Sequence, residues 1–136
     1  MTDYTHYKKL IDGQWVSASD GAKFDSLNPT TGKIWATVPE ATAQDVDRAV
    51  RAADRAFTEG LWPAMSASER GHCLRRLAML LLERSDELGA IETIDTGKML
   101  KETRWQAKYI SEFFHFFAGC ADKIHGETLP IDKPEM

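Results

Sequence analysis

The first forty residues alternate short apolar runs with turn-forming residues, a pattern typical of β-strands. Apolar pairs at residues 10–11 and 15–16 flank Asp12-Gly13, which predicts a hairpin because both residues of such a turn favour a positive φ angle. Two further strands are expected at residues 24–27 and 34–38, on either side of the turn sequence NPTTG. The turn sequence SDG separates the hairpin from these strands. We therefore expect a β-ribbon region over residues 1–40.

From Thr42 onward the apolar positions follow a helical period instead. They recur three and four residues apart, at Val46, Ala49, Val50, Ala53 and Phe57. Thr42 is placed to cap this first helix, with Asp45 three residues later. The sequence GLWP at residues 60–63 ends it.

Three more helices are predicted after this one. The capping sequence from Ser66 to Glu69 opens the second helix, and its inward residues are expected to be Cys73, Leu74, Leu77 and Leu81. The third begins at residues 85–87 and stops at Gly97, since glycine adopts the left-handed conformation without steric cost. The fourth runs from about residue 100 to residue 118, and residues 128–131 resemble the start of a strand.

These elements predict one unit with two parts. The β-ribbon region is followed by a helical region over residues 41–120 and an extended tail over residues 121–136. No repeat or low-complexity segment interrupts this order.

The amino-acid composition is that of a globular protein and gives no support to nucleic-acid or membrane binding. Hydrophobic residues make up 43% and charged residues 28%, as in ordinary globular domains. With 17 basic against 21 acidic residues, the chain has no basic surplus for nucleic acid and no polybasic patch for a membrane. The two cysteines, Cys73 and Cys120, form no CxxC pair, so we expect a reducing, cytoplasmic setting.

Four stretches in order resemble the aldehyde dehydrogenase superfamily, from about Leu10 to the last residue. They are IDGQWV at residues 11–16, FDSLNPTTGK with the following ATV at residues 24–38, ETIDTGK at residues 92–98 and FAGCADKIHG at residues 117–126. Each motif is weak alone, but their order and spacing together make chance similarity improbable.

The resemblance implies an α/β parent fold, Rossmann-like, in which this chain begins the NAD(P)-binding domain of a homo-oligomer. Members of that family oxidise an aldehyde to a carboxylic acid through a cysteine thiohemiacetal, with hydride transfer to NAD or NADP and a glutamate that activates water. Those catalytic residues belong to a later segment, so we assign no catalytic and no cofactor-binding residue here. The nine glycines never form G-x-G. We expect the chain to be a truncated fragment that is inactive alone.

The resemblance also suggests a cation site. In some members a monovalent cation, K⁺ or Na⁺, binds near the start of the domain, and the matching positions here are Ser26, Leu27 and Asp95. A structural role for Asp95, pairing with a base or capping backbone amides, is the alternative.

The fourth helix supplies walls of the substrate tunnel in related enzymes. The candidates here are Trp105, Tyr109, Ile110 and Phe113. An aromatic stripe at this spacing also occurs in ordinary cores, so core packing is the alternative.

The remaining candidates for chemistry favour structural roles. Cys73 is expected on an apolar helix face, where a thiol is inert, and His72 beside it points elsewhere. Cys120 is expected to fill space, while His115 and His125 show no spacing that suggests a metal site.

A second class of function also remains open at this point. The exposed aromatic end of the fourth helix could belong to a stand-alone interaction or self-association module without catalysis. A small enzyme of unrelated chemistry lacks a supporting set of residues. The sequence leaves open which aldehyde is the substrate and whether NAD or NADP is used.

Overall fold

The computed structural model describes residues 5–127, and its first part is built from two small sheets. β2 (Lys9–Ile11) and β3 (Gln14–Val16) form an antiparallel hairpin, and Ile11 pairs with Gln14 across its turn. Asp12 and Gly13 have φ angles of 54° and 72°. The predicted two-residue turn is therefore confirmed.

A three-stranded sheet lies beside this hairpin. β4 (Lys23–Asn28) pairs antiparallel with β5 (Lys33–Pro39), and β1 (Thr5–His6) adds a parallel edge. The predicted turn between β4 and β5 is confirmed, because the amides of Thr31 and Gly32 both donate to the carbonyl of Asn28. β1 has only two residues and no apolar alternation, so the sequence pattern did not predict it.

α1 (Ala43–Thr58) begins as predicted. Thr42 and Asp45 form a reciprocal capping box, in which each side chain accepts the other residue's backbone amide. A four-residue helix, α2 (Leu61–Ala64), follows the end of α1. The described residues therefore form five helices rather than the expected four. Pro63 fits in α2 because the first turn of a helix does not use its own amide hydrogens.

Asp45 also ties the hairpin to α1. Its carboxylate, only 1% exposed, lies 2.5 Å from the ammonium of Lys9 and accepts the backbone amide of Ser19 at 3.1 Å. The ammonium of Lys9 is the main reason that the pKa of Asp45 lies far below its usual range. One side chain thus joins β2, the loop after β3 and the start of α1.

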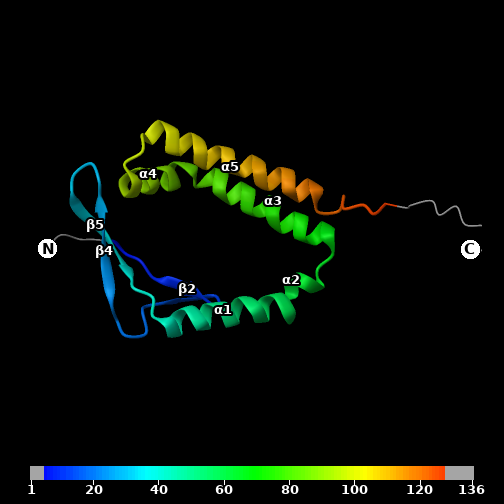
Figure 1. Cartoon of the computed structure of the whole chain (residues 1–136). Helices are drawn as coiled ribbons and strands as arrows, with labels where there is room; N and C mark the ends of the chain where they lie inside the picture. Colours follow the sequence, from blue (N-terminus) through cyan, green and yellow to red (C-terminus); the bar gives the residue numbers. More distant parts are fainter. Residues whose placement is uncertain (1–4, 128–136) are drawn as a thin grey trace, which may run out of the picture.

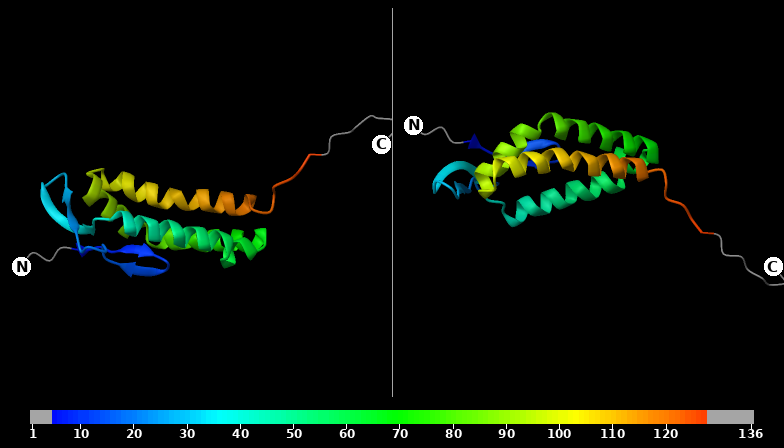
Figure 2. Two further views of the ribbon diagram at one scale, coloured as in Figure 1. Left: turned by 60° about the horizontal axis from the view of Figure 1, so that its bottom comes forward. Right: turned by 90° about the horizontal axis from the view of Figure 1, so that it is seen from above.

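The last three helices pack side by side. α5 (Leu100–Cys120) lies along both α3 (Ala67–Glu83) and α4 (Ser85–Thr96), as Figure 1 shows. In that view α1 runs along the other side of the molecule and is joined to α3 through α2. The strands β4 and β5 lie at the end away from α2, and β2 lies beside α1. The further views in Figure 2 show α5 beside α3 and α4 along its whole length.

Small residues set how closely these helices approach. Gly71 of α3 faces Ala118 of α5, since a Cβ at Gly71 would lie 2.8 Å from the carbonyl oxygen of Ala118, and Ala78 of α3 is fully buried. The predicted inward face of α3 is therefore wrong in part, since Cys73 is exposed and Leu77 is 40% exposed. The helices come closest where side chains are small, and that face is centred on Gly71 and Ala78.

The helical face predicted for α1 forms but stays uncovered in the described chain. Val46, Val50 and Phe57 are 54%, 61% and 74% exposed. The predicted strand at residues 128–131 lies outside the described residues. Across residues 5–127, no helix is both long and apolar enough to cross a membrane.

Candidate functional site

The residues predicted to bind a cation meet where a strand reaches the end of a helix. Ser26 of β4 and Asp95 of α4 lie 69 positions apart in the sequence, and the Ser26 hydroxyl donates to Asp95 Oδ1 at 2.6 Å. The indole nitrogen of Trp35 donates to the same hydroxyl oxygen at 3.0 Å. The Ser26 hydroxyl therefore links the Trp35 side chain to the Asp95 carboxylate.

A β-bulge positions Trp35 for this contact. Ser26 pairs with Ala36 and Leu27 pairs with Ile34, so Trp35 has no partner residue on β4. The Trp35 ring packs edge-on against Tyr7, with centroids 5.9 Å apart. The bulge thus leaves the indole N–H free to reach Ser26.

Gly97 brings the end of α4 against the turn that follows β4. Its φ angle of 77° is left-handed, as predicted, and a Cβ there would lie 2.8 Å from Cγ of Pro29. This close approach fixes the end of α4, which carries Asp95, beside the strand that carries Ser26.

The potential metal ligands near Asp95 and Ser26 carry little negative charge. Within residues 5–127 no three His, Cys, Asp or Glu side chains gather as a metal cluster. A single carboxylate with backbone carbonyls of Ser26 and Leu27 suits a hard monovalent cation better than a transition metal. The structure brings Ser26 and Asp95 together, and the cation role stays a prediction. Asp95 accepts from a hydroxyl here and pairs with no base among the described residues.

The predicted tunnel residues form an aromatic stripe along α5. Trp105 stacks on Tyr109 with centroids 4.8 Å apart, and Tyr109 meets Phe113 edge-on at 5.3 Å. All three rings and Ile110 are exposed, between 46% and 59%. They are therefore not core residues of the described chain.

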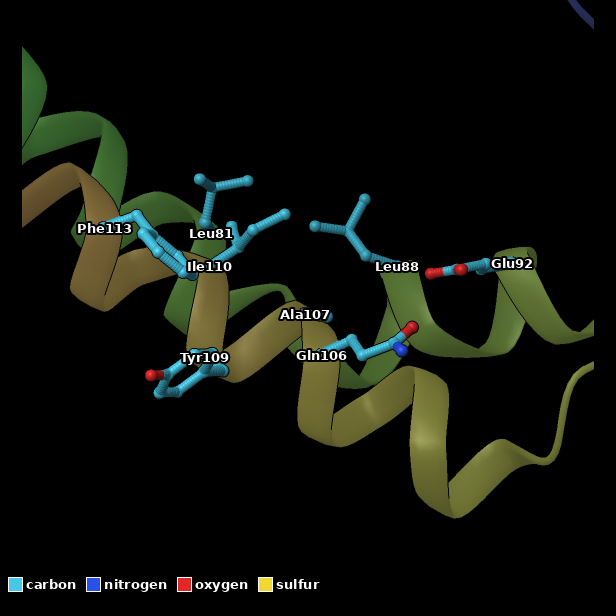
Figure 3. A pocket seen from close by; sticks show the side chains of 8 residues that line it. All are labelled: Leu81, Leu88, Glu92, Gln106, Ala107, Tyr109, Ile110 and Phe113. Atoms are coloured by element: carbon cyan, nitrogen blue, oxygen red, sulfur yellow. The ribbon is translucent and has the colours of Figure 1, made fainter.

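Three of these residues line an apolar groove between α3, α4 and α5. The groove has a volume of ≈ 380 Å³, within the range of small-molecule sites. Its lining consists of Leu81, Leu88, Glu92, Gln106, Ala107, Tyr109, Ile110 and Phe113. Figure 3 shows Leu81, Ile110 and Phe113 gathered at one end and Glu92 with Gln106 at the other.

Glu92 gives this groove its one acidic group. Its Oε1 lies 2.7 Å from the ammonium of Lys98, and this hydrogen bond raises the pKa of Lys98. The contribution of α3 and α4 to the groove was not predicted from the sequence. The sequence around Leu81 and Leu88 does not distinguish leucines that line a groove from leucines buried in a core.

A second hollow lies on α5 beside Trp105. It measures ≈ 520 Å³, and we call it the basic groove; its lining consists of Leu100, Lys101, Arg104, Trp105 and Lys108. The sequence pattern did not lead us to predict a cluster of cations here. The signal was present, since Lys101, Arg104 and Lys108 recur three and four residues apart on one face of the helix.

The cysteines and histidines contribute to neither groove. Cys73 is exposed and Cys120 is half-buried. His115 is half-buried on α5, and His125 is exposed beyond it. The prediction that Cys73 lies on a buried helix face is wrong, because its side chain is exposed.

Comparison with known proteins gives a consistent result. The family model described as aldehyde dehydrogenase family matches residues 15–136. A relative from Acinetobacter baylyi, (Z)-2-((N-methylformamido)methylene)-5-hydroxybutyrolactone dehydrogenase, is 49% identical over 96% of this chain and 26% of its own length. The benzaldehyde dehydrogenase of Antirrhinum majus is 43% identical over 93% of this chain and 24% of its own length.

Solved structures agree with these relatives. The NAD-dependent aldehyde dehydrogenase of Sinorhizobium meliloti superimposes with a TM-score of 0.87 at 36% identity, over 92% of this chain and 25% of that one. A betaine aldehyde dehydrogenase of Staphylococcus aureus, in complex with NAD⁺, gives 0.86 at 38% identity over 93% and 26%. The chain thus spans about a quarter of the length of the proteins it matches.

Proposed function

The chain belongs to the aldehyde dehydrogenase family, and we propose that it forms the N-terminal part of the NAD(P)-binding domain of an enzyme that oxidises an aldehyde to a carboxylic acid. The observation that carries this proposal is the match over residues 15–136, supported by structures that share this fold at a TM-score of 0.87. In such an enzyme a cysteine thiolate attacks the aldehyde to form a thiohemiacetal.

The cofactor is proposed for the whole enzyme and not for these residues. NAD or NADP would accept the hydride, and the neighbour from Staphylococcus aureus is described as an NAD⁺ complex. The 136 residues contain no G-x-G sequence that could cradle a pyrophosphate. The residues present do not fit the cofactor, and we propose that the chain alone is inactive.

The role proposed for this chain in catalysis is to shape the path of the substrate. Tyr109, Ile110 and Phe113 present exposed apolar surface to the groove between α3, α4 and α5. Because apolar walls exclude water and orient an aldehyde without binding it tightly, this surface suits a tunnel wall.

One assay tests the proposed activity. The product of the whole reading frame that contains these residues is purified and assayed with NAD or NADP and a panel of small aldehydes. We expect reduction of the cofactor with formation of the acid, and none from the 136-residue chain under the same conditions. Turnover by the chain alone would contradict its proposed inactivity, and no turnover by the longer product would contradict the family activity.

The tunnel role has its own test in the active protein. Replacing Tyr109 with Ala is expected to change KM for the aldehyde severalfold while KM for the cofactor stays within about twofold. Phe116→Ala is the matched control, since Phe116 is 65% exposed on the same helix and lies outside the groove. An equal effect of both variants would contradict the proposal.

We also propose that Ser26, Leu27 and Asp95 hold a structural K⁺ or Na⁺ ion in the enzyme. The contact between Ser26 and Asp95 supports this, because it brings a carboxylate, an oxygen ligand of the kind that a hard cation takes, against β4. Crystals soaked in rubidium or caesium salts are expected to show anomalous density beside Asp95, and an Asp95→Ala crystal is expected to show none there.

Two further properties are proposed for the whole protein, a homo-oligomeric state and a cytoplasmic location. The uncovered apolar faces of α1 and α5 support the first. The exposed free thiol of Cys73 supports the second, since reducing compartments keep such thiols unpaired. Light scattering and cell fractionation of the tagged protein test the two properties separately.

A module that only binds partners or itself is the second candidate function. The uncovered aromatic stripe of α5 favours it. A reading frame that continues into a Rossmann-like stretch and a later cysteine would rule it out.

A further inference from the structure

The basic groove combines positive charge with an exposed aromatic ring. Lys101, Arg104 and Lys108 line it together with Trp105, whose side chain is 59% exposed. Arg104 has one acidic neighbour, Asp86, at 3.5 Å. Within residues 5–127, neither Lys101 nor Lys108 has a carboxylate within 4.0 Å. The groove therefore holds a surplus of positive charge.

The aromatic stripe connects the basic groove to the apolar groove. Trp105 lines the first, Tyr109 lines the second, and the two rings stack with planes only 11° apart. A molecule that rests on Trp105 is therefore one helical turn from Tyr109. Along α5 the basic groove therefore comes first and the apolar groove follows it.

We propose that the basic groove captures an anionic aldehyde, one that carries a carboxylate on a planar apolar group, before the aldehyde passes along the stripe. This inference rests on the proposed function, because it takes the apolar groove to be part of the substrate path. The two ammonium groups attract the carboxylate, and the indole contacts the planar group. A groove lined with one sign of charge also raises the local concentration of a substrate of opposite sign.

The same groove disfavours a cationic substrate. A positively charged aldehyde would meet three cations of like charge at this point, which lowers its rate of association. The preference for an anion is a property of this chain's own side chains, and their charges can be removed without touching the aromatic stripe.

A binding experiment tests the capture step without catalysis. The 136-residue chain is titrated with 4-formylbenzoate and with benzaldehyde, and the Trp105 indole signal is followed by NMR after assignment with Trp105→Phe. We expect the anion to shift this signal at a concentration lower by about tenfold than the neutral aldehyde, because a salt-screened charge attraction adds to the ring contact. Equal response to both compounds would overturn the inference.

Two double variants separate the groove from the overall charge. K101Q/K108Q is expected to abolish the preference for the anion. K23Q/K33Q makes the same change in net charge on β4 and β5 and is expected to preserve that preference. Loss of the preference in both variants would mean that net charge alone causes it, which overturns the inference.

Turnover by the product of the whole reading frame completes the test. We expect kcat/KM for 4-formylbenzoate to fall by about tenfold in K101Q/K108Q, while kcat/KM for benzaldehyde stays unchanged. If both aldehydes are oxidised and K101Q/K108Q leaves kcat/KM for 4-formylbenzoate relative to benzaldehyde unchanged, the inference alone is overturned. If other aldehydes of the panel are oxidised but 4-formylbenzoate is not, the inference alone fails, whereas the proposed function fails only if no aldehyde of the panel is oxidised.

Discussion

Among single residues, Asp45 joins parts of the chain that lie far apart in the sequence. The capping pattern predicts its contact with Thr42 because the two residues are only three positions apart. Its contacts with Lys9 and Ser19 follow from the position of the hairpin beside α1, which no local pattern encodes. The sequence therefore predicts half of the role of Asp45.

The first prediction concerns acid stability. Because the folded-state pKa of Asp45 lies below its unfolded value, its contribution is fully present above the unfolded pKa and is lost as pH falls toward the folded pKa. Asp45→Asn should lower Tm near pH 7 by roughly 10 °C, since it leaves the buried Lys9 ammonium without its counter-charge.

Thermal unfolding between pH 7 and pH 3 checks this. At pH values below about 5 the wild-type Tm should decrease. The difference in Tm between wild type and variant should shrink as the pH is lowered. Asp47→Asn is the matched control, because Asp47 pairs with Arg51 on the exposed side of the same helix. A difference that stays constant with pH would contradict the role of the carboxylate charge.

The second prediction concerns helix contact. A Cβ at Gly89 would lie 2.8 Å from the backbone nitrogen of Arg104, so Gly89→Ala must push α4 away from α5. We expect a loss of about 2 kcal/mol in the free energy of unfolding. Gly119→Ala is the control, since nothing lies within 4 Å of its Cβ and alanine is the better helix former. Denaturant titration measures both, and equal losses would contradict the prediction.

Among the elements, those defined by local chemistry are predicted well. The Asp12-Gly13 hairpin, the Gly97 stop and the caps at Thr42 and Ser66 all depend on residues within a few positions of each other. The inward face of α3 depends on its partner, and there the expectation for Cys73 was wrong. α2 and β1 were not predicted, because elements of four and two residues are too short to show a helical or strand periodicity of apolar residues.

The third prediction tests one of these caps. The Ser66 hydroxyl accepts the backbone amide of Glu69 at 3.2 Å, so Ser66→Ala should cost about 1 kcal/mol in the free energy of unfolding. Ser68→Ala, two positions later in the same helix and exposed, should change it by less than about 0.5 kcal/mol. Denaturant titration of the three proteins compares them, and identical midpoints would exclude a capping role.

For the whole molecule, the resemblance predicted residues that the fold then brought together. Ser26 and Asp95 were paired from motif positions alone, and the structure joins them by a hydrogen bond. The bulge that turns Trp35 toward Ser26 was not predicted, because a register shift depends on how two strands pair. The apolar groove was missed in part for the same reason, since its walls come from α3, α4 and α5.

The fourth prediction concerns self-association of the isolated chain. Phe116 and Phe117 are 65% and 58% exposed at the end of α5, and such apolar surface favours contact with a second copy. Sedimentation should therefore show oligomers that dissociate at low concentration. F116E/F117E should weaken the association by at least about tenfold, because a charge at an apolar contact remains without a partner.

Leu61→Glu is the control for that experiment, since Leu61 is 80% exposed and lies on α2, not on α5. It should leave the association unchanged. A monodisperse monomer at high concentration would contradict the prediction.

The contact between Ser26 and Asp95 has a consequence for the order of folding during synthesis. Residues 5–58 contain all five strands and α1, and residues 67–120 contain the three helices that pack together. Each half is continuous in the sequence, so the first can form on the ribosome before the second has emerged. The hydrogen bond between Ser26 and Asp95 forms only when both halves are present. The ion proposed for this contact would therefore bind late, after the strands and α4 have met.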